Sequence, residues 1–111
     1  DYWLSLKAGE RIEIKPPATI ADGLRTTRPG AHNFPIIQRL VEDVLLVSED
    51  EIREAVWYVM SRAKMVVEPS GVVGAAAVLN GKVAGQAERV GVVISGGNVD
   101  AEALAEVLKV G

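Results

Sequence analysis

Apolar residues follow two kinds of spacing along this chain, and the two kinds alternate. Short apolar runs at 44–47 and 90–94 are typical of strands buried on both faces of a parallel sheet. Alternating polar and apolar residues at 11–15 are typical of a half-buried strand. Helical spacing of apolar residues predicts helices at 3–8, 34–41, 52–63, 70–79 and 101–108. This order of strands and helices predicts an α/β fold with mainly parallel pairing.

Several helix boundaries carry local signals. Ser48 and Glu51 have the spacing of a capping box, and Val47 and Ile52 have that of a hydrophobic staple. Pro69 either ends one helix or begins the next, because proline suits a first turn and clashes in a helix interior. The next helix is expected to stop at Asn80-Gly81, and Asp100 is expected to cap the last one. The apolar face expected for that last helix comprises Ala101, Leu104, Ala105 and Leu108.

The turn between the last expected strand and helix is the first candidate site. The apolar run ends at Ser95, and Gly96 and Gly97 allow backbone conformations that are closed to other residues. Ligands of open α/β sheets bind in the crevice outside the carboxyl ends of the strands. A polar turn at this place therefore predicts a ligand site.

Composition limits the class of protein. The chain has 111 residues, the size of one domain, with 49% hydrophobic and 5% aromatic residues, which suits a core of aliphatic side chains in α/β layers. A net charge of −3 without a basic cluster argues against nucleic acid as a partner. No apolar stretch has the length of a membrane span, and no signal peptide is recognisable. The absence of cysteine favours a reducing compartment, so we expect a cytoplasmic protein.

Three motifs together resemble one enzyme family. They are Ser95-Gly-Gly-Asn-Val-Asp100, Thr19-Ile-Ala-Asp-Gly-Leu-Arg25 and Val67-Glu-Pro-Ser-Gly71. In order and spacing they resemble the C-terminal part of the threonine dehydratase and serine racemase family, pyridoxal-phosphate enzymes of the tryptophan synthase β-subunit fold. The resemblance covers essentially the whole chain. It implies that residues 1–111 are the C-terminal portion of a pyridoxal-phosphate-binding large domain, in three αβα layers with a mostly parallel sheet.

The resemblance also assigns roles to individual residues. It places Ser95 opposite the pyridine nitrogen of the cofactor, with Gly96, Gly97 and Gly23 presenting backbone and Glu68 near the ring and substrate. The residues themselves leave other interpretations open. Ser95 could satisfy backbone groups at a strand end, and Glu68 could be an acidic residue favoured beside a helix N-terminus. Asp22, beside Gly23, could equally be a turn residue.

Two regulatory sites are implied by some relatives. One is a nucleotide site at a dimer interface, which would involve Asn98 and Lys64, although a solvated lysine is the better interpretation of Lys64. The other is a divalent cation site, for Mg or Ca, which would involve Asp1 with an upstream glutamate that this chain lacks. One carboxylate does not make a metal site. His32, the single histidine, is read as a surface loop residue.

We expect this chain to form part of an enzyme. The resemblance implies a pyridoxal-phosphate-dependent threonine or serine dehydratase, which converts L-threonine or L-serine to a 2-oxo acid and ammonia by β-elimination. The family's Schiff-base lysine lies upstream, and no lysine here has the family's Ser-x-Lys-x-Arg setting. We therefore expect this chain to be inactive without its partner, the upstream half of the same enzyme, and the whole to be a homo-oligomer. The alternatives are serine racemase, a non-catalytic fragment, or a separate module that binds an anion or nucleotide at Gly96, Gly97 and Asn98.

Overall fold

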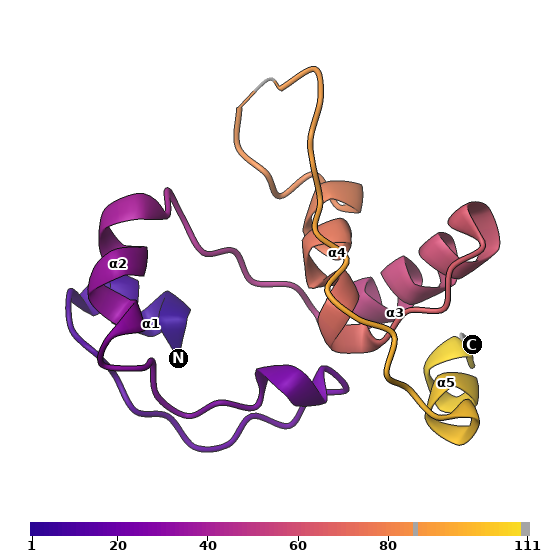
Figure 1. Cartoon of the computed structure of the whole chain (residues 1–111), viewed down its shortest axis with the longest axis horizontal. Helices are drawn as coiled ribbons and strands as arrows, with labels where there is room; N and C mark the ends of the chain where they lie inside the picture. Colours follow the sequence, from indigo (N-terminus) through magenta and orange to yellow (C-terminus); the bar gives the residue numbers. More distant parts are fainter. Residues whose placement is uncertain (86, 110–111) are drawn as a thin grey trace.

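The computed structural model describes residues 1–85 and 87–109, and within these residues the regular elements are all helical (Figure 1). The α-helices are α1 (Tyr2–Ala8), α2 (Asn33–Leu40), α3 (Glu49–Tyr58), α4 (Val73–Leu79) and α5 (Ala101–Leu108). Two short 3-10 helices, η1 (Asp22–Leu24) and η3 (Pro69–Val72), and one π-helix, η2 (Val59–Ala63), complete them. None of the helices in this part of the chain is long and apolar enough to cross a membrane.

The three expected strands are not confirmed. Residues 11–15, 44–47 and 90–94 lie in non-helical connections, which Figure 1 shows as long open traces. A strand exists only through hydrogen bonds to a neighbouring strand. Within the described residues, the nearest approach to such pairing is a single bond of 2.8 Å from Ile14 N to Thr27 O in the first of these segments. The αβα layering is therefore not visible in this part of the chain.

The hydrophobic core lies where α3, α4 and α5 meet. Ala55 and Val56 on α3 are completely buried, as is Ala76 on α4. Val107 brings α5 into the same cluster with 5% exposure. The helices α1 and α2 lie apart from this cluster, beyond a long connection (Figure 1). The core thus holds the C-terminal half of the chain together and fixes the segments between its helices.

Local capping signals are confirmed. The Ser48 hydroxyl accepts a hydrogen bond of 3.2 Å from Glu51 N, and the Glu51 carboxylate accepts one of 2.7 Å from Ser48 N. Val47 packs, half-buried, against the cluster that contains Ile52. At α5, Asp100 Oδ1 accepts a bond of 2.7 Å from Ala103 N. Each of these bonds satisfies a backbone group that the first turn of a helix leaves without an intrahelical partner.

One helix differs from expectation, and the boundaries at Pro69 and Asn80 agree with it. The helix expected over 52–63 is α-helical only to Tyr58, and the π-helix η2 completes it, ending at Lys64 in the left-handed conformation with φ 59°. Pro69 was expected either to end one helix or to begin the next. It begins η3, so the second expectation is confirmed. α4 then stops before Asn80, as expected.

The predicted apolar face of α5 is right in part, because Leu104 and Leu108 pack against the core. Val107 is its buried residue, with Leu104 and Leu108 half-buried beside it, whereas Ala101 and Ala105 are exposed. The larger side chains bury more apolar area and so decide which face turns inward.

Candidate functional site

The segments 66–71 and 95–97 press against each other backbone to backbone. Glu68 N donates to Gly96 O at 3.2 Å, and Ser95 N donates to Gly71 O at 3.4 Å. A Cβ added at Gly71 would lie 2.7 Å from Gly96 O, and one added at Gly97 would lie 2.6 Å from Val66 O. Only glycine permits such an approach. We call this contact the glycine junction.

A second link joins η1 to the same place. The Ser70 hydroxyl accepts a hydrogen bond of 2.9 Å from Gly23 N and donates one of 3.3 Å to Asp22 Oδ1. A Cβ at Gly23 would lie 3.1 Å from Ser70 Oγ. The structure therefore brings together the three motifs, which lie at 19–25, 67–71 and 95–100 in the sequence.

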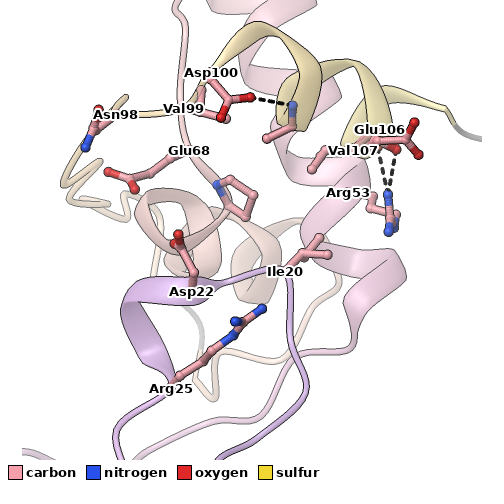
Figure 2. A pocket seen from close by; sticks show the side chains of 12 residues that line it. Ile20, Asp22, Arg25, Arg53, Glu68, Asn98, Val99, Asp100, Glu106 and Val107 are labelled. Carbon is pink, nitrogen blue, oxygen red and sulfur yellow. Dashed lines mark hydrogen bonds between the residues drawn. The ribbon is translucent and has the colours of Figure 1, made fainter.

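A pocket of about 350 Å³ opens between these segments and α5 (Figure 2). Its volume falls within the range of small-molecule sites. It is lined by Ile20, Asp22, Arg25, Arg53, Glu68, Pro69, Asn98, Val99, Asp100, Ala103, Glu106 and Val107. Carboxylates and guanidinium groups thus meet in one pocket, which suits a ligand that carries both charges.

Several polar groups of the pocket are already engaged. Arg25 donates to Thr19 O through Nε at 3.1 Å and Nη2 at 2.7 Å. Arg53 Nη1 donates to the carbonyl oxygens of Glu106 and Val107 at 2.9 and 3.3 Å, shown as dashed lines in Figure 2. These bonds fix both arginine side chains against the backbone. They leave the two guanidinium groups as positioned charges at the pocket wall.

Glu68 and Asn98 are the polar side chains that remain for a ligand. Both lie at the same end of the pocket in Figure 2. Among the described residues, neither the Glu68 carboxylate nor the Asn98 amide makes a side-chain hydrogen bond, and Glu68 is half-buried. A carboxylate in such a position gains most from a ligand that supplies a donor.

The structure gathers most of the residues predicted from sequence. Glu68 and Asn98 line the pocket, and Ser95, Gly96 and Gly97 form one side of the adjacent glycine junction. Gly23 is tied to that junction through Ser70, as described above.

Lys64 and Asp1 do not line this pocket. Lys64 is exposed, and its Nζ donates to Ser61 O at 2.6 Å. The Asp1 carboxylate caps α1 by accepting from Tyr2 N at 2.8 Å and also accepts from Thr26 Oγ1 at 3.0 Å. Among the residues that the structure describes, no group of three or more acidic, histidine or cysteine side chains could hold a metal ion.

The family model for pyridoxal-phosphate dependent enzymes matches residues 3–96. The chain belongs to this family. An L-threo-3-hydroxyaspartate ammonia-lyase of Pseudomonas sp is 48% identical over 95% of this chain and 33% of its own length. An L-threonine ammonia-lyase of Geobacter sulfurreducens is 38% identical over 96% of this chain and 27% of its length. The chain therefore spans about a third of the length of the curated relatives it matches.

Solved structures agree with this membership. Maize serine racemase superposes with a TM-score of 0.86 at 36% identity, over 96% of this chain and 33% of that protein. The structural neighbours are pyridoxal-phosphate enzymes of the tryptophan synthase β type. The arrangement of helices and connections in this chain is thus that of the corresponding third of such an enzyme.

Family membership implies pyridoxal phosphate, and the residues present fit this cofactor. At the glycine junction a Cβ on Gly96 would overlap Glu68 Oε1. The absence of a side chain at this position therefore makes room for the Glu68 carboxylate. Ser95 is exposed, and its hydroxyl makes no hydrogen bond within residues 1–85 and 87–109. A hydroxyl donor and a carboxylate beside a bare backbone are groups that can hold a planar, polar ring.

Sequence analysis missed several residues of the pocket. Arg25 lines the pocket, and Ser70 does not line it but links η1 to the neighbouring segment; each lies inside a quoted motif, so position in the motif was a signal that could have pointed to them. Arg53 carried no such signal, because on α3 it reads as a solvated neighbour of buried Ile52. Its place at the pocket follows from the packing of α5 on α3, which local sequence does not reveal.

Proposed function

We propose that this chain supplies one wall of the cofactor and substrate site of a pyridoxal-phosphate-dependent ammonia-lyase. The reaction would convert L-threonine or L-serine to a 2-oxo acid and ammonia by β-elimination. The observation that carries the proposal is the glycine junction, where Gly96, which follows the exposed Ser95, lies against the Glu68 carboxylate. Family membership supplies the cofactor.

Each residue at the junction would have a distinct role. Pyridoxal phosphate, when bound, serves as an electron sink whose strength depends on the protein group facing its pyridine nitrogen. Ser95 would face that nitrogen with a neutral hydroxyl, which does not hold the ring protonated as a carboxylate would. Gly96, Gly97 and Gly23 would present backbone close to the ring, and Glu68 would hold or move a proton near the substrate.

The names of the relatives narrow the substrate class. Threonine, serine and 3-hydroxyaspartate all carry a hydroxyl group on the carbon next to the α-carbon, and the relatives named for them match nearly the whole of this chain. An amino acid with that hydroxyl has a leaving group in position for β-elimination. We therefore extend the proposed class to 3-hydroxy amino acids, with L-threonine and L-serine as the first candidates.

The rest of the active site would come from outside this chain. The relatives carry about two thirds of their length beyond the matched region. We propose that this portion provides the Schiff-base lysine and completes a three-layer αβα domain with a mostly parallel sheet, in a homo-oligomeric enzyme. Residues 1–111 alone would be inactive.

Serine racemase is the second candidate activity. It is supported by the close superposition with the maize enzyme, with a TM-score of 0.86. Both activities would begin on the same amino acid and use the same residues of this chain. They differ in whether the hydroxyl leaves or the proton returns to the opposite face.

A product assay on the intact enzyme separates the candidates. Purified enzyme is given L-threonine, L-serine or L-threo-3-hydroxyaspartate, and both 2-oxo acid and inverted amino acid are measured. We expect 2-oxo acid and ammonia in equal amounts as the main products. Inverted amino acid as the main product would establish the racemase instead, and a protein that neither binds the cofactor nor turns over substrate would leave only a binding module.

Substitution of Ser95 tests the assigned role. In the intact enzyme, Ser95→Ala should weaken cofactor binding modestly, by roughly 0.5–1.5 kcal/mol for one neutral hydrogen bond. Ser95→Asp should raise the pKa of the pyridine nitrogen and move the product ratio from 2-oxo acid toward inverted or transaminated product. An unchanged ring protonation in the Asp variant would show that Ser95 does not face the nitrogen.

A further inference from the structure

The loop at 19–25, which carries η1 and is called the η1 loop below, has a bonded backbone. Every backbone N–H group from Ile20 to Arg25 donates a hydrogen bond within the protein. Three of these groups bond to carbonyl oxygens of the loop itself, at 2.9 to 3.3 Å, and the other three bond to side chains. Surface loops are usually more mobile than the elements they connect, so a loop bonded in this way is held in place for a physical reason.

Glu49 anchors the start of the η1 loop. Its carboxylate accepts from Ile20 N at 2.8 Å through Oε2 and from the Thr19 hydroxyl through Oε1. The same hydroxyl accepts from Ala21 N at 3.1 Å, so one carboxylate holds three successive residues. Hydrogen bonds to an ionised carboxylate are stronger than those between neutral groups. Glu49 and Thr19 are both half-buried, which limits the competition from water.

The anchor belongs to a helix of the core. Glu49 is the first residue of α3, directly after the capping residue Ser48, and Ile52 in the same helix is buried. The η1 loop reaches the same core through Ala21, which is 1% exposed. A side chain on such a helix holds its partner more precisely than a side chain on another loop does.

The tip of the η1 loop is fixed separately. The Ser70 hydroxyl accepts from Gly23 N and donates to Asp22 Oδ1, as described above. Ser70 lies two residues after Glu68, whose backbone is bonded at the glycine junction. The loop is therefore held at its start by Glu49 and at its tip by Ser70.

These two attachments place two carboxylates at one pocket. Asp22 and Glu68 both line it, and Figure 2 shows them on the same side of it. The backbone at Ala21, with φ −78° and ψ 72°, makes an inverse γ-turn that is closed by a bond of 3.0 Å from Asp22 N to Ile20 O. The chain thus passes from a buried residue to the exposed Asp22 in one step. The position of Asp22 depends on the bonds of its loop, because its side chain is not packed in the core.

We propose that Glu49 is a positioning residue of the enzyme, which acts through the η1 loop to set Asp22 and Gly23 at the site. The inference rests on the proposed function, because it requires cofactor and substrate to bind along this wall. Glu49 does not line the pocket, so it acts on the reaction only through the groups that it holds. A misplacement of about 1 Å caused by a change away from the chemistry can lower a rate about 100-fold.

Asp50 offers a matched control. A carboxylate in the first turn of a helix also interacts favourably with the helix dipole, and this effect alone changes stability rather than rate. Asp50 follows Glu49 in the first turn of α3, carries the same charge and is exposed. Thr19 and Ile20 bond to Glu49 and not to Asp50. Removal of either carboxylate therefore weakens the dipole interaction, but only removal of Glu49 releases the loop.

Steady-state kinetics of the intact, cofactor-loaded enzyme test the proposal, with rates normalised to bound cofactor. We expect Glu49→Ala to lower kcat at least about 10-fold with a smaller change in KM, because groups at the reacting centre are displaced. Asp50→Ala should keep kcat within about twofold of wild type, since it removes only the dipole interaction. A wild-type kcat in Glu49→Ala, or an equal loss of kcat in Asp50→Ala, would overturn the proposal whatever the unfolding temperatures are.

Thr19 provides a second pair of variants, which serves where Glu49→Ala does not fold. Thr19→Val keeps the shape and removes the donor to Glu49, so kcat should fall. Thr19→Ser keeps the hydroxyl and should recover most of that loss. The double variant Glu49→Ala, Thr19→Val should have a kcat close to that of Glu49→Ala alone, because both changes break one link. Two losses that multiply in full would show that Glu49 does not act through Thr19.

Hydrogen exchange reports the release of the loop independently of the reaction. Backbone amides of 20–25 are followed by mass spectrometry in the intact enzyme. They should exchange at least about 10-fold faster in Glu49→Ala than in wild type or Asp50→Ala, because their local opening becomes easier. Unchanged exchange in Glu49→Ala would overturn the proposal.

Turnover of the wild-type enzyme separates this test from that of the proposed function. A wild type that forms no product from any 3-hydroxy amino acid rejects the proposed function and the positioning role with it. An active wild type with an equally active Glu49→Ala variant rejects the positioning role alone. Where inverted amino acid is the main product, its rate of formation is the rate compared between the variants.

Discussion

At the scale of single residues, the glycines near the site differ in what a side chain would meet. At Gly71 and Gly97 an added Cβ would meet backbone oxygens, at 2.7 and 2.6 Å. At Gly96 it would meet the end of the Glu68 side chain, which can rotate away. At Gly91 nothing lies within 4 Å. The same substitution should therefore have three different results along one short stretch.

We predict that Gly97→Ala destabilises the intact enzyme by roughly 1–3 kcal/mol, because two backbones must separate to admit the methyl group. Gly96→Ala should cost less stability but displace the Glu68 carboxylate, so that activity falls more than stability does. Gly91→Ala is the control and should leave the urea unfolding curve nearly unchanged. Equal free energies of unfolding for Gly97→Ala and Gly91→Ala would contradict the close approach at the glycine junction.

A charged contact at the start of α3 gives a second residue-scale prediction. Glu51 Oε2 accepts from Ser48 N at 2.7 Å and lies 2.7 Å from Lys82 Nζ. The hydrogen bond from Lys82, followed by that from Ser48, lowers the pKa of Glu51 below its ordinary value of 4.5. The side chains are 21% and 33% exposed, so the contact ties the loop after α4 to α3 at the surface.

The sign of the pH effect follows from the lowered pKa. A carboxylate with a lowered folded-state pKa contributes stability above its unfolded pKa and loses it as the pH falls through the folded value. Glu51→Gln should therefore reduce the urea midpoint at pH 7, and the difference from wild type should shrink below about pH 4.5. Glu54→Gln, on the exposed side of the same helix, is the control. A difference that stays constant down to pH 3 would refute the assignment.

At the scale of elements, sequence analysis succeeded where the signal is local. The capping box at Ser48, the cap at Asp100 and the stop after Leu79 depend on residues within one turn of each other, and all are confirmed. The sequence also pointed to Glu68 and Asn98 through motifs that resemble a family; both line the pocket, and their roles stay predictions.

Elements that depend on residues far away in the sequence were predicted less well. The strands expected at 44–47 and 90–94 have the right composition, but pairing requires a neighbour that local sequence cannot supply. The inward face of α5 depends on Val107, which contacts a core assembled from several helices. Arg53 lies at the pocket because α5 packs on α3. Local chemistry predicted where helices begin and end, and tertiary packing decided what they face.

The cap of α5 allows an element-scale test. Asp100→Ala should cost the intact enzyme about 1 kcal/mol, since the bond from Ala103 N to Asp100 Oδ1 would be lost and a backbone donor left to water. Asp100→Asn should retain most of the stability, because asparagine caps about as well as aspartate. The free energies of unfolding in urea are compared for the three proteins. Equal losses in both variants would show that charge in the pocket matters more than the cap.

At the scale of the whole molecule, residues 1–111 are more open than a protein of their length. The radius of gyration is 14.8 Å, whereas a compact domain of this size has one of about 13 Å. Figure 1 shows the reason, because α1 and α2 lie to one side and the loop after α4 projects away from the helices. Such a shape agrees with the proposal that the portion which the relatives carry beyond the matched region completes these surfaces.

This openness predicts how the isolated chain behaves. Residues 1–111 prepared alone should bind the apolar dye ANS, because the aliphatic side chains at 43–47 and 90–93 remain exposed. We expect the intact enzyme to bind much less dye for the same molar amount, because the rest of the proposed αβα domain would cover those side chains. A Leu45→Thr, Val93→Thr double variant of the isolated chain should lose part of the fluorescence, which ties the dye to these side chains rather than to general unfolding. Dye binding by the intact enzyme equal to that of the isolated chain would mean that the apolar surface stays exposed in the complete protein, and its exposure would then need a partner from outside the enzyme.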